Sequence, residues 1–210
     1  MAAAKPAKTK AVPAARATGK LALHPLTPGR WADFEAIFQS RGCSIARGCW
    51  CMFYRWSGRG AAPAPGQTLA QRNHDAFKAL VDRGVFTGLI AYRGPQPVGW
   101  LSFGPREGYA KLARSPVMKP VDEQPVWSIV CFVVPAEHRG QGVARALLAG
   151  AVAHCKAQGV ALLEAYPVDK AERSNDEFLW FGAKTMFDEA GFEEVARRKP
   201  ARPVVRLRPA

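Results

Sequence analysis

Residues 126–157 read VWSIVCFVVPAEHRGQGVARALLAGAVAHCKA, and this stretch decides the fold. The segment 126–134 is a nearly continuous apolar run, which is typical of a central strand that is buried on both faces. Residues 142–157 follow a helical period, with a buried stripe of Leu147, Leu148, Ala151, Val152 and Cys155 and a closing Gly159. The sequence therefore predicts a buried strand, a glycine-rich turn and a helix.

The turn between this strand and helix has the chemistry of a phosphate site. Gly140 and Gly142 allow the backbone to come close to a ligand, and the free N–H groups of the first helical turn face it with the helix dipole behind them. Arg139 adds a cation. The loop does not match the Walker pattern, which ends in Gly-Lys-Ser/Thr. It does not match the dinucleotide-binding fingerprint either, because Arg145 stands where that pattern needs its third glycine.

Outside this unit, strands and helices alternate. Thr27 and Pro28 are typical of a helix start, Thr68 begins a second helix that ends near Gly84, and residues 93–97 join two strands as a hairpin. The predicted strands are 21–24, 86–92, 98–103, 126–134, 160–166, 192–197 and 204–207, and the predicted helices are 28–40, 68–83, 142–157 and 176–189. The fold class is α/β, with a central mixed sheet flanked by helices.

Composition sets the outer limits. The chain of 210 residues carries a net charge of +13 and is 48% hydrophobic, enough for one well-buried core. Residues 1–20 contain five basic residues, no acid and no aromatic residue, so we expect a disordered basic tail before one domain at 21–210. With no secretory signal and no membrane span, we expect a cytoplasmic protein without a membrane partner.

The cysteines fit this compartment. There are five of them, at Cys43, Cys49, Cys51, Cys131 and Cys155. We expect reduced thiols, with the segment 41–66 packed as a lid or pocket wall. Cys43, Cys49, Cys51 and His74 could be read as zinc ligands, but the spacing lacks two paired half-sites, so no metal is expected.

Arg139, Gly142 and Ala144 resemble the Gln/Arg-x-x-Gly-x-Gly/Ala signature of the GNAT superfamily of N-acetyltransferases, and the element order is similar over about residues 21–208. The resemblance implies acetyl-CoA as co-substrate, with the loop amides on its pyrophosphate and the strand before the loop paired with its pantetheine arm. The cofactor residues so implied are Phe132, Val133, Val134, Arg139, Gly140, Gln141, Gly142, Val143 and Ala144. His138 could touch the phosphates or be an exposed loop residue.

This sequence departs from the family pattern at the position of the general acid. A tyrosine usually stands four residues before a Gly-Phe pair, but here Phe187 precedes Gly191-Phe192, and Trp180 replaces the usual asparagine. Another residue supplies the proton, the thiolate leaves unassisted, or the protein binds CoA without turnover. Glu164 as base and Tyr166 as acid are the candidates, since they share one strand face; the alternative is an exposed Glu and a half-buried aromatic.

Three functions follow. The first is acetyl transfer to a primary amine of a small molecule or a protein, by direct attack on the thioester. The second is a non-catalytic acyl-CoA-binding regulatory module, suggested by Phe187. The third is nucleic-acid binding through the basic tail, although no specific nucleic-acid partner is expected. A homodimer is a common default for such a protein.

Overall fold

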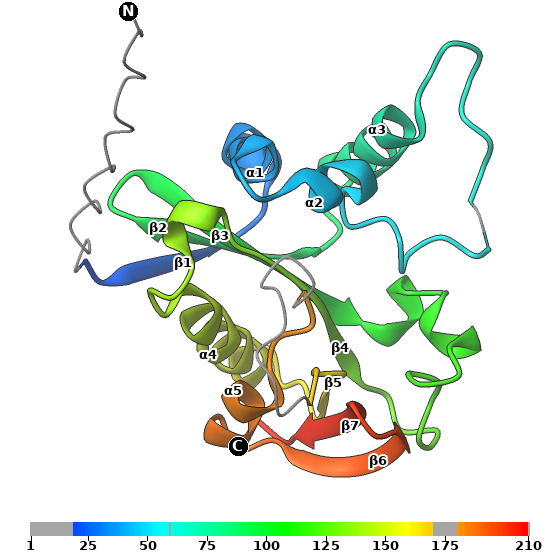
Figure 1. Cartoon of the computed structure of the whole chain (residues 1–210), viewed down its shortest axis with the longest axis vertical. Coiled ribbons are helices and arrows are strands. Elements are labelled where there is room, and N and C mark those ends of the chain that lie inside the picture. The colour runs from blue at the N-terminus through cyan, green and yellow to red at the C-terminus, as the bar shows by residue number, and fades with distance from the viewer. Residues whose placement is uncertain (1–18, 59, 170–179, 210) are drawn as a thin grey trace, which may run out of the picture.

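The computed structural model describes residues 19–58, 60–169 and 180–209. A seven-stranded mixed sheet runs through them in the order β1-β2-β3-β4-β5-β7-β6 (Figure 1). The strands are β1 (Leu21–Pro25), β2 (Gly88–Arg93), β3 (Gln96–Pro105), β4 (Trp127–Val133), β5 (Leu163–Ala165), β6 (Glu193–Lys199) and β7 (Arg202–Leu207). Every neighbouring pair is antiparallel except β4 and β5.

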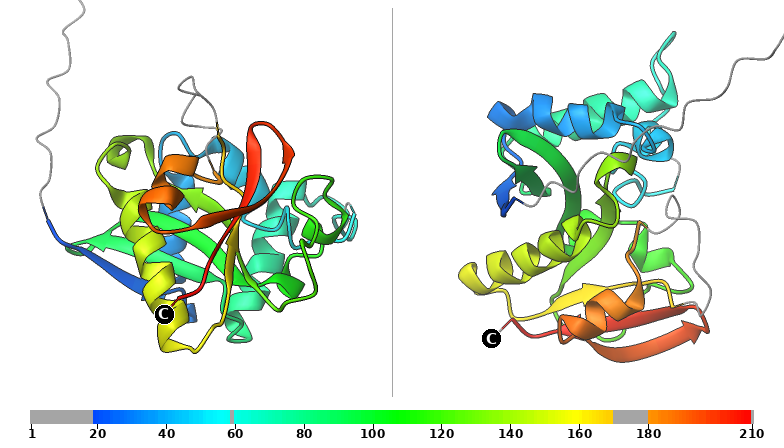
Figure 2. Two further views of the ribbon diagram at one scale, coloured as in Figure 1. Left: turned by 90° about the horizontal axis from the view of Figure 1, so that it is seen from below. Right: turned by 60° about the vertical axis from the view of Figure 1, so that its left-hand side comes forward.

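Helices cover both faces of the sheet (Figure 2). They are α1 (Trp31–Gln39), α2 (Ser44–Cys49), α3 (Leu69–Asp82), α4 (Val143–Ala157) and α5 (Lys184–Glu189), with short 3-10 turns at Pro28–Arg30, Arg106–Gly108, Leu112–Arg114 and Ala136–His138. One apolar core joins α1, α2 and α3 to one sheet face, and another joins α4 and α5 to the opposite face. The α/β fold class with helices on both faces is confirmed.

Local sequence explains the best-defined helices. Thr68 and Gln71 form a reciprocal capping box at the start of α3, and Gly84 follows its end with a φ of +72°. Helix α4 buries Leu147, Leu148, Ala151 and Cys155, as the periodicity predicted, while Val152 is only partly buried. Helix α3 thus formed where the apolar pattern and the cap agree, and α4 formed where the apolar pattern predicted it.

Other boundaries differ from the prediction. The helix predicted at 176–189 is only Lys184–Glu189 where it is described, because Gly182 has a φ of +74° and Ala183 bridges Val168; positions 176–179 lie outside the described residues. The segment 41–66 contains the short helix α2, which was not predicted. The strand predicted at 160–166 shortens to β5, and Thr27 makes no side-chain cap. Of the predicted tail, only positions 19 and 20 are described.

The middle of the sheet opens beside β4. Strands β4 and β5 pair only from Trp127 to Ile129, and β4 has an extra residue, Val130, between its partners on β3, which is a β-bulge. Beyond the bulge, the amide of Phe132 donates instead to the carbonyl of Trp180, at 2.6 Å. The carboxyl half of β4 is therefore separated from β5.

Candidate active site

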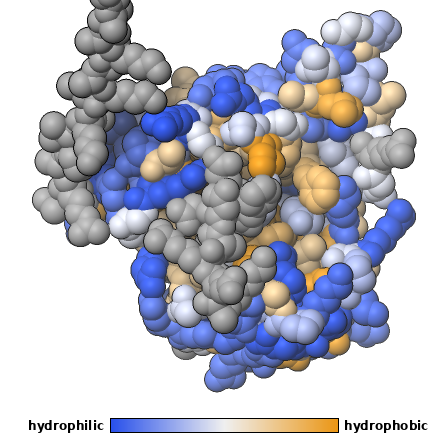
Figure 3. Space-filling model, viewed as in Figure 1, coloured by the Kyte–Doolittle hydropathy of each residue, from blue (hydrophilic) through white to orange (hydrophobic). Residues whose placement is uncertain are grey.

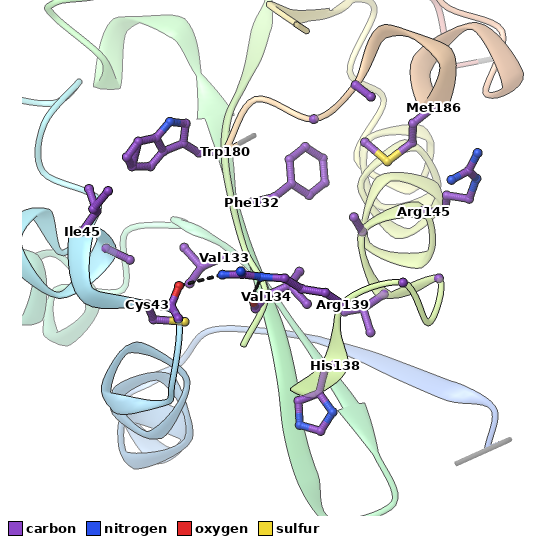
Figure 4. Close-up of a pocket in the computed structure, with 18 of the residues that line it drawn as sticks. Cys43, Ile45, Phe132, Val133, Val134, His138, Arg139, Arg145, Trp180 and Met186 are labelled. Atoms are coloured by element: carbon purple, nitrogen blue, oxygen red, sulfur yellow. Dashed lines mark hydrogen bonds between the residues drawn. The ribbon is translucent and has the colours of Figure 1, made fainter. Parts of the chain in front are cut away.

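A cavity of about 360 Å³ lies where β4 separates from β5 (Figure 4). Its walls come from four segments far apart in the sequence: 42–46, 132–134, 138–145 without Gln141, and parts of 180–186. Hydrophobic residues are also visible in the middle of this face of the molecule, between helices α2 and α3 above and the strands below (Figure 3). The described cavity lining contains arginines and a histidine and no carboxylate, so it suits an anion.

The loop glycines leave room for a ligand. Gly140 and Gly142 have φ values of +68° and +78°, a conformation that glycine adopts at little cost. A Cβ built on either residue would meet no heavy atom within 4 Å. Helix α4 begins at the next residue, Val143, without a side-chain cap, so its first N–H groups face the open space. This is a cradle that fits a phosphate group.

Arg139 braces the loop. Its Nε donates to the carbonyl of Val134 at 3.0 Å and its Nη2 to the carbonyl of Gly42 at 2.6 Å (Figure 4). Gly42 has a φ of +77°, and a Cβ there would come within 3.0 Å of the Arg139 guanidinium. Arg139 is therefore a cation in the cavity wall that is held by two backbone carbonyls.

The other loop side chains divide between the cavity and the surface. Gln141 accepts from Arg93 at 2.7 Å and donates to the carbonyl of Glu137 at 2.6 Å, which holds its side chain outside the cavity. His138 lines the cavity and is 8% exposed, so the expectation of an exposed loop histidine is wrong. Burial lowers its pKa, which leaves the imidazole neutral at pH 7.

The strand side of the cavity is apolar. Phe132, Val133 and Val134 line it together with Val143 and Ala144 from the start of α4, so these predicted residues are brought together. The amide of Phe132 already donates to Trp180, and the backbone alternation of β4 points the Val134 amide the same way. A pantetheine arm that pairs with this edge would either replace the Trp180 carbonyl as the acceptor of the Phe132 amide or form hydrogen bonds with backbone groups that follow Phe132 on the strand.

Glu164 and Tyr166 do meet, but in a buried cluster. The Tyr166 hydroxyl donates to Glu164 Oε1 at 2.7 Å, and both side chains are fully buried, so the exposed-Glu and half-buried-aromatic alternative is wrong. Arg106 and Arg206 each form an ion pair with Glu164, and Ser128 lies 3.0 Å from the Tyr166 hydroxyl. Neither Glu164 nor Tyr166 is among the residues that line the cavity.

Sequence reasoning missed the two arginines of this cluster. Arg206 also binds Asp122, at 2.6 Å, and this hydrogen bond lowers the pKa of Asp122 to about 2. Burial and the charge of Glu164 raise the pKa of Tyr166. The partners of Glu164 lie 58 and 42 positions away in the chain, so no local spacing marks them.

Phe187 and the cysteines are packing residues in this structure. Phe187 is fully buried beneath Phe132, with ring centroids 6.3 Å apart. None of the five cysteines is in a disulfide; Cys43 lines the cavity, and Cys51 accepts a hydrogen bond from the Trp100 indole at 3.2 Å. His74 contacts Glu35 and Asp75 at 2.7 and 2.9 Å, and no group of three or more metal-binding side chains is found among the described residues.

Comparison with known proteins settles the family. A family model for the acetyltransferase (GNAT) family matches residues 50–179. The chain belongs to this family. No curated protein is similar enough to be matched. No helix among the described residues is long and apolar enough to cross a membrane.

Solved structures share the fold. A polyamine N-acetyltransferase of Drosophila melanogaster, which forms N-acetylagmatine, is 11% identical with a TM-score of 0.54, over 90% of this chain and 100% of that one. The GNAT domain of S. lividans PAT is 14% identical with a TM-score of 0.53, over 92% and 93%. An acetyltransferase of Thermus thermophilus is 20% identical with a TM-score of 0.50, over 92% and 99%. At these identities the likeness concerns the fold alone.

Proposed function

We propose that this GNAT protein transfers the acetyl group of acetyl-CoA to a primary amine by direct attack. The observation that carries the proposal is the open cradle at Gly140 and Gly142, at the start of α4, inside a cavity with no described carboxylate. Bound acetyl-CoA supplies an activated thioester. The loop amides hold its pyrophosphate, with Arg139 beside them, while Phe132 and Val134 offer backbone groups to its pantetheine arm once that arm displaces the Trp180 carbonyl from the Phe132 amide.

The proton transfers form a separate part of the proposal. Glu164 as base and Tyr166 as acid stay a prediction, and their complete burial with two arginines favours a positioning role over contact with substrate. Phe187 has no acidic proton. A CoA thiol is acidic enough to leave without a strong general acid, so turnover does not require a tyrosine at 187.

The position of Phe187 also supports a second function. If the leaving thiolate does need a proton, a protein with the cradle and with phenylalanine at 187 binds acyl-CoA and does not turn it over. It would then act as a regulatory module. The acceptor of the first function, whether a small amine or a protein amine, and the assembly into a homodimer stay proposals.

Calorimetric titration with acetyl-CoA tests the cradle. Gly142→Trp places an indole in the open space and should weaken binding by ~100-fold or more. Gly159→Trp is the matched control, because Gly159 has the same positive φ and the same empty surroundings at the other end of α4. Equal binding by wild type and Gly142→Trp would refute the cradle.

An amine panel scored by thiol release separates the two functions. Release with any primary amine supports the transferase. Tight binding of acetyl-CoA with no release across small amines, amino acids and peptide amines favours the regulatory module. Glu164→Gln and Tyr166→Phe, assayed on a confirmed acceptor, test the predicted pair: wild-type turnover in both removes it from the mechanism.

A further inference from the structure

Arg202 stands at the start of β7 without the partner that its charge calls for. Its guanidinium lies 4.2 Å from the centroid of the Phe181 ring, it is only partly exposed, and its buried Nε has no hydrogen-bond partner. In the described parts of the chain, no carboxylate lies within ion-pair distance of it. The terminal N–H groups of the guanidinium are therefore left for another acceptor.

Arg206, on the same strand, differs from Arg202 because it forms ion pairs with carboxylates. The two residues are four positions apart, so their side chains share a face of β7. Arg206 holds both Glu164 and Asp122, while Asp169 is bound by Arg197 at 2.7 Å. Glu164, Asp122 and Asp169 are thus already neutralised, and among the described residues no carboxylate forms an ion pair with Arg202.

The surroundings of Arg202 form an aromatic box. Tyr54 meets Phe181 edge to face, with centroids 5.5 Å apart, and Arg202 acts electrostatically on the Tyr54 hydroxyl. Burial raises the pKa of Tyr54 to about 12, so this hydroxyl keeps its proton and is able to donate it in a hydrogen bond. A guanidinium and a phenol over an aromatic floor suit a carboxylate.

This box adjoins the cofactor strand. Phe181 follows Trp180, whose carbonyl accepts a hydrogen bond from the Phe132 amide, and Tyr54 and Cys131 both pack against the apolar cluster that contains Phe181. Phe181 packs with Val130 and Tyr166, while Phe132 and Met186 pack on the α4 side. The box therefore lies next to the cofactor cavity, because Phe181 stands between Trp180 and Gly182, which both line that cavity.

We infer that Arg202 and Tyr54 bind the carboxylate of the acceptor, which makes the substrate a primary amine that carries a carboxylate, such as an amino acid. This inference rests on the proposed acetyl transfer and names its substrate class. The guanidinium also disfavours the ammonium form of a nearby amine, so it helps to present the neutral nucleophile. A polycationic acceptor would meet the Arg202 cation, which no described carboxylate offsets.

Matched acceptors give the first test. Amino acids and their C-terminal amides offer the same amine with and without the carboxylate, and kcat/KM is compared above the pKa values of both amines. Wild type should prefer the acids by ~10-fold or more, the effect of one charge-assisted contact. Equal or better use of the amides, or a preference for agmatine-like cations, would overturn the inference and leave the transferase intact.

Variants assign the effect to Arg202. Arg202→Gln should bring the acid-to-amide ratio close to one through a higher KM for acids, with acetyl-CoA affinity unchanged. Lys199→Gln removes the same charge from the same hairpin, at the residue paired with Arg202, and should keep the wild-type ratio. A ratio that persists in Arg202→Gln contradicts the inference.

A binding measurement keeps the inference testable without turnover. Calorimetric titration of the amino acid into CoA-loaded protein should show a Kd that rises ~10-fold or more in Arg202→Gln. Arg202→Lys keeps the charge and loses the planar fork, so it serves if the glutamine variant does not fold, and a Kd like that of wild type would contradict a bidentate contact. Acid binding without thiol release supports the site and refutes the transferase.

Discussion

The loop of Arg139 to Ala144 and the cluster around Glu164 both hold charge inside this protein, yet they are built in opposite ways. The loop presents backbone N–H groups and empty space, with φ values above +60° at Gly140 and Gly142. The cluster is filled: Glu164 is fully buried and bound by Arg106, Arg206 and Tyr166. An open polar site has room for a ligand, whereas a filled one has its hydrogen bonds satisfied within the fold.

The largest effect should follow from breaking the filled cluster. Glu164→Gln leaves two arginines without their buried anion and should lower the free energy of unfolding by about 3 kcal/mol, measured in urea. Glu189→Gln is the control, because its ion pair with Arg145 is 58% exposed on both sides and should matter little. Unchanged stability together with lost turnover would instead identify Glu164 as catalytic.

Phe187→Tyr tests whether a hydroxyl at the position of the family's general acid affects stability or turnover. A hydroxyl added to this fully buried ring has no described partner, so the free energy of unfolding should fall by about 2 kcal/mol, with no gain in turnover. Phe53→Tyr adds the same hydroxyl to a side chain that is 51% exposed and should change neither. A rise in thiol release in Phe187→Tyr would show that the missing acid limits the reaction.

Replacing two glycines by alanine separates the cost of backbone strain from the cost of occupying the space of the predicted ligand. Gly142→Ala and Gly159→Ala should each cost about 1 kcal/mol of stability, because both residues have a positive φ and no neighbour within 4 Å. Only Gly142→Ala should also weaken acetyl-CoA binding, by ~10-fold. Thermal unfolding and calorimetry measure the two effects, and equal affinities would argue against a ligand at Gly142.

The difference between the regions also explains what the sequence could predict. Strand, glycine turn and helix are contiguous, so the motif of Arg139, Gly142 and Ala144 was enough to find the cradle and the family. For the cluster, alternation along the strand placed Glu164 and Tyr166 on one face and said nothing of Arg106 or Arg206, which arrive from other segments. The helix over 176–189 failed for a tertiary reason, since Ala183 pairs with Val168.

The smallest effect concerns His138, the titratable side chain of the open region. Burial lowers its pKa, so the folded state binds fewer protons than the unfolded state, whose histidine titrates near 6.5. Above that pH, His138 does not change the free energy of unfolding. Below it, the unfolded state binds the extra proton, so the free energy of unfolding falls as the pH drops. His138→Gln should therefore flatten the loss of unfolding free energy between pH 7.5 and 5.5, followed by urea titration.

Bound acetyl-CoA should reverse this trend, because anionic phosphates beside His138 favour its protonated form. Wild-type affinity for acetyl-CoA should then rise as the pH falls from 7.5 to 6.5, where a phosphate monoester with a second pKa of about 6 still keeps most of its charge, and the rise should be smaller in His138→Gln. His154→Gln is the control: burial lowers the pKa of His154 as well, but this residue lies in the last turn of α4, outside the cavity lining. Identical pH profiles for the two variants would place the phosphates away from His138 and leave the N–H groups of α4 as their holders.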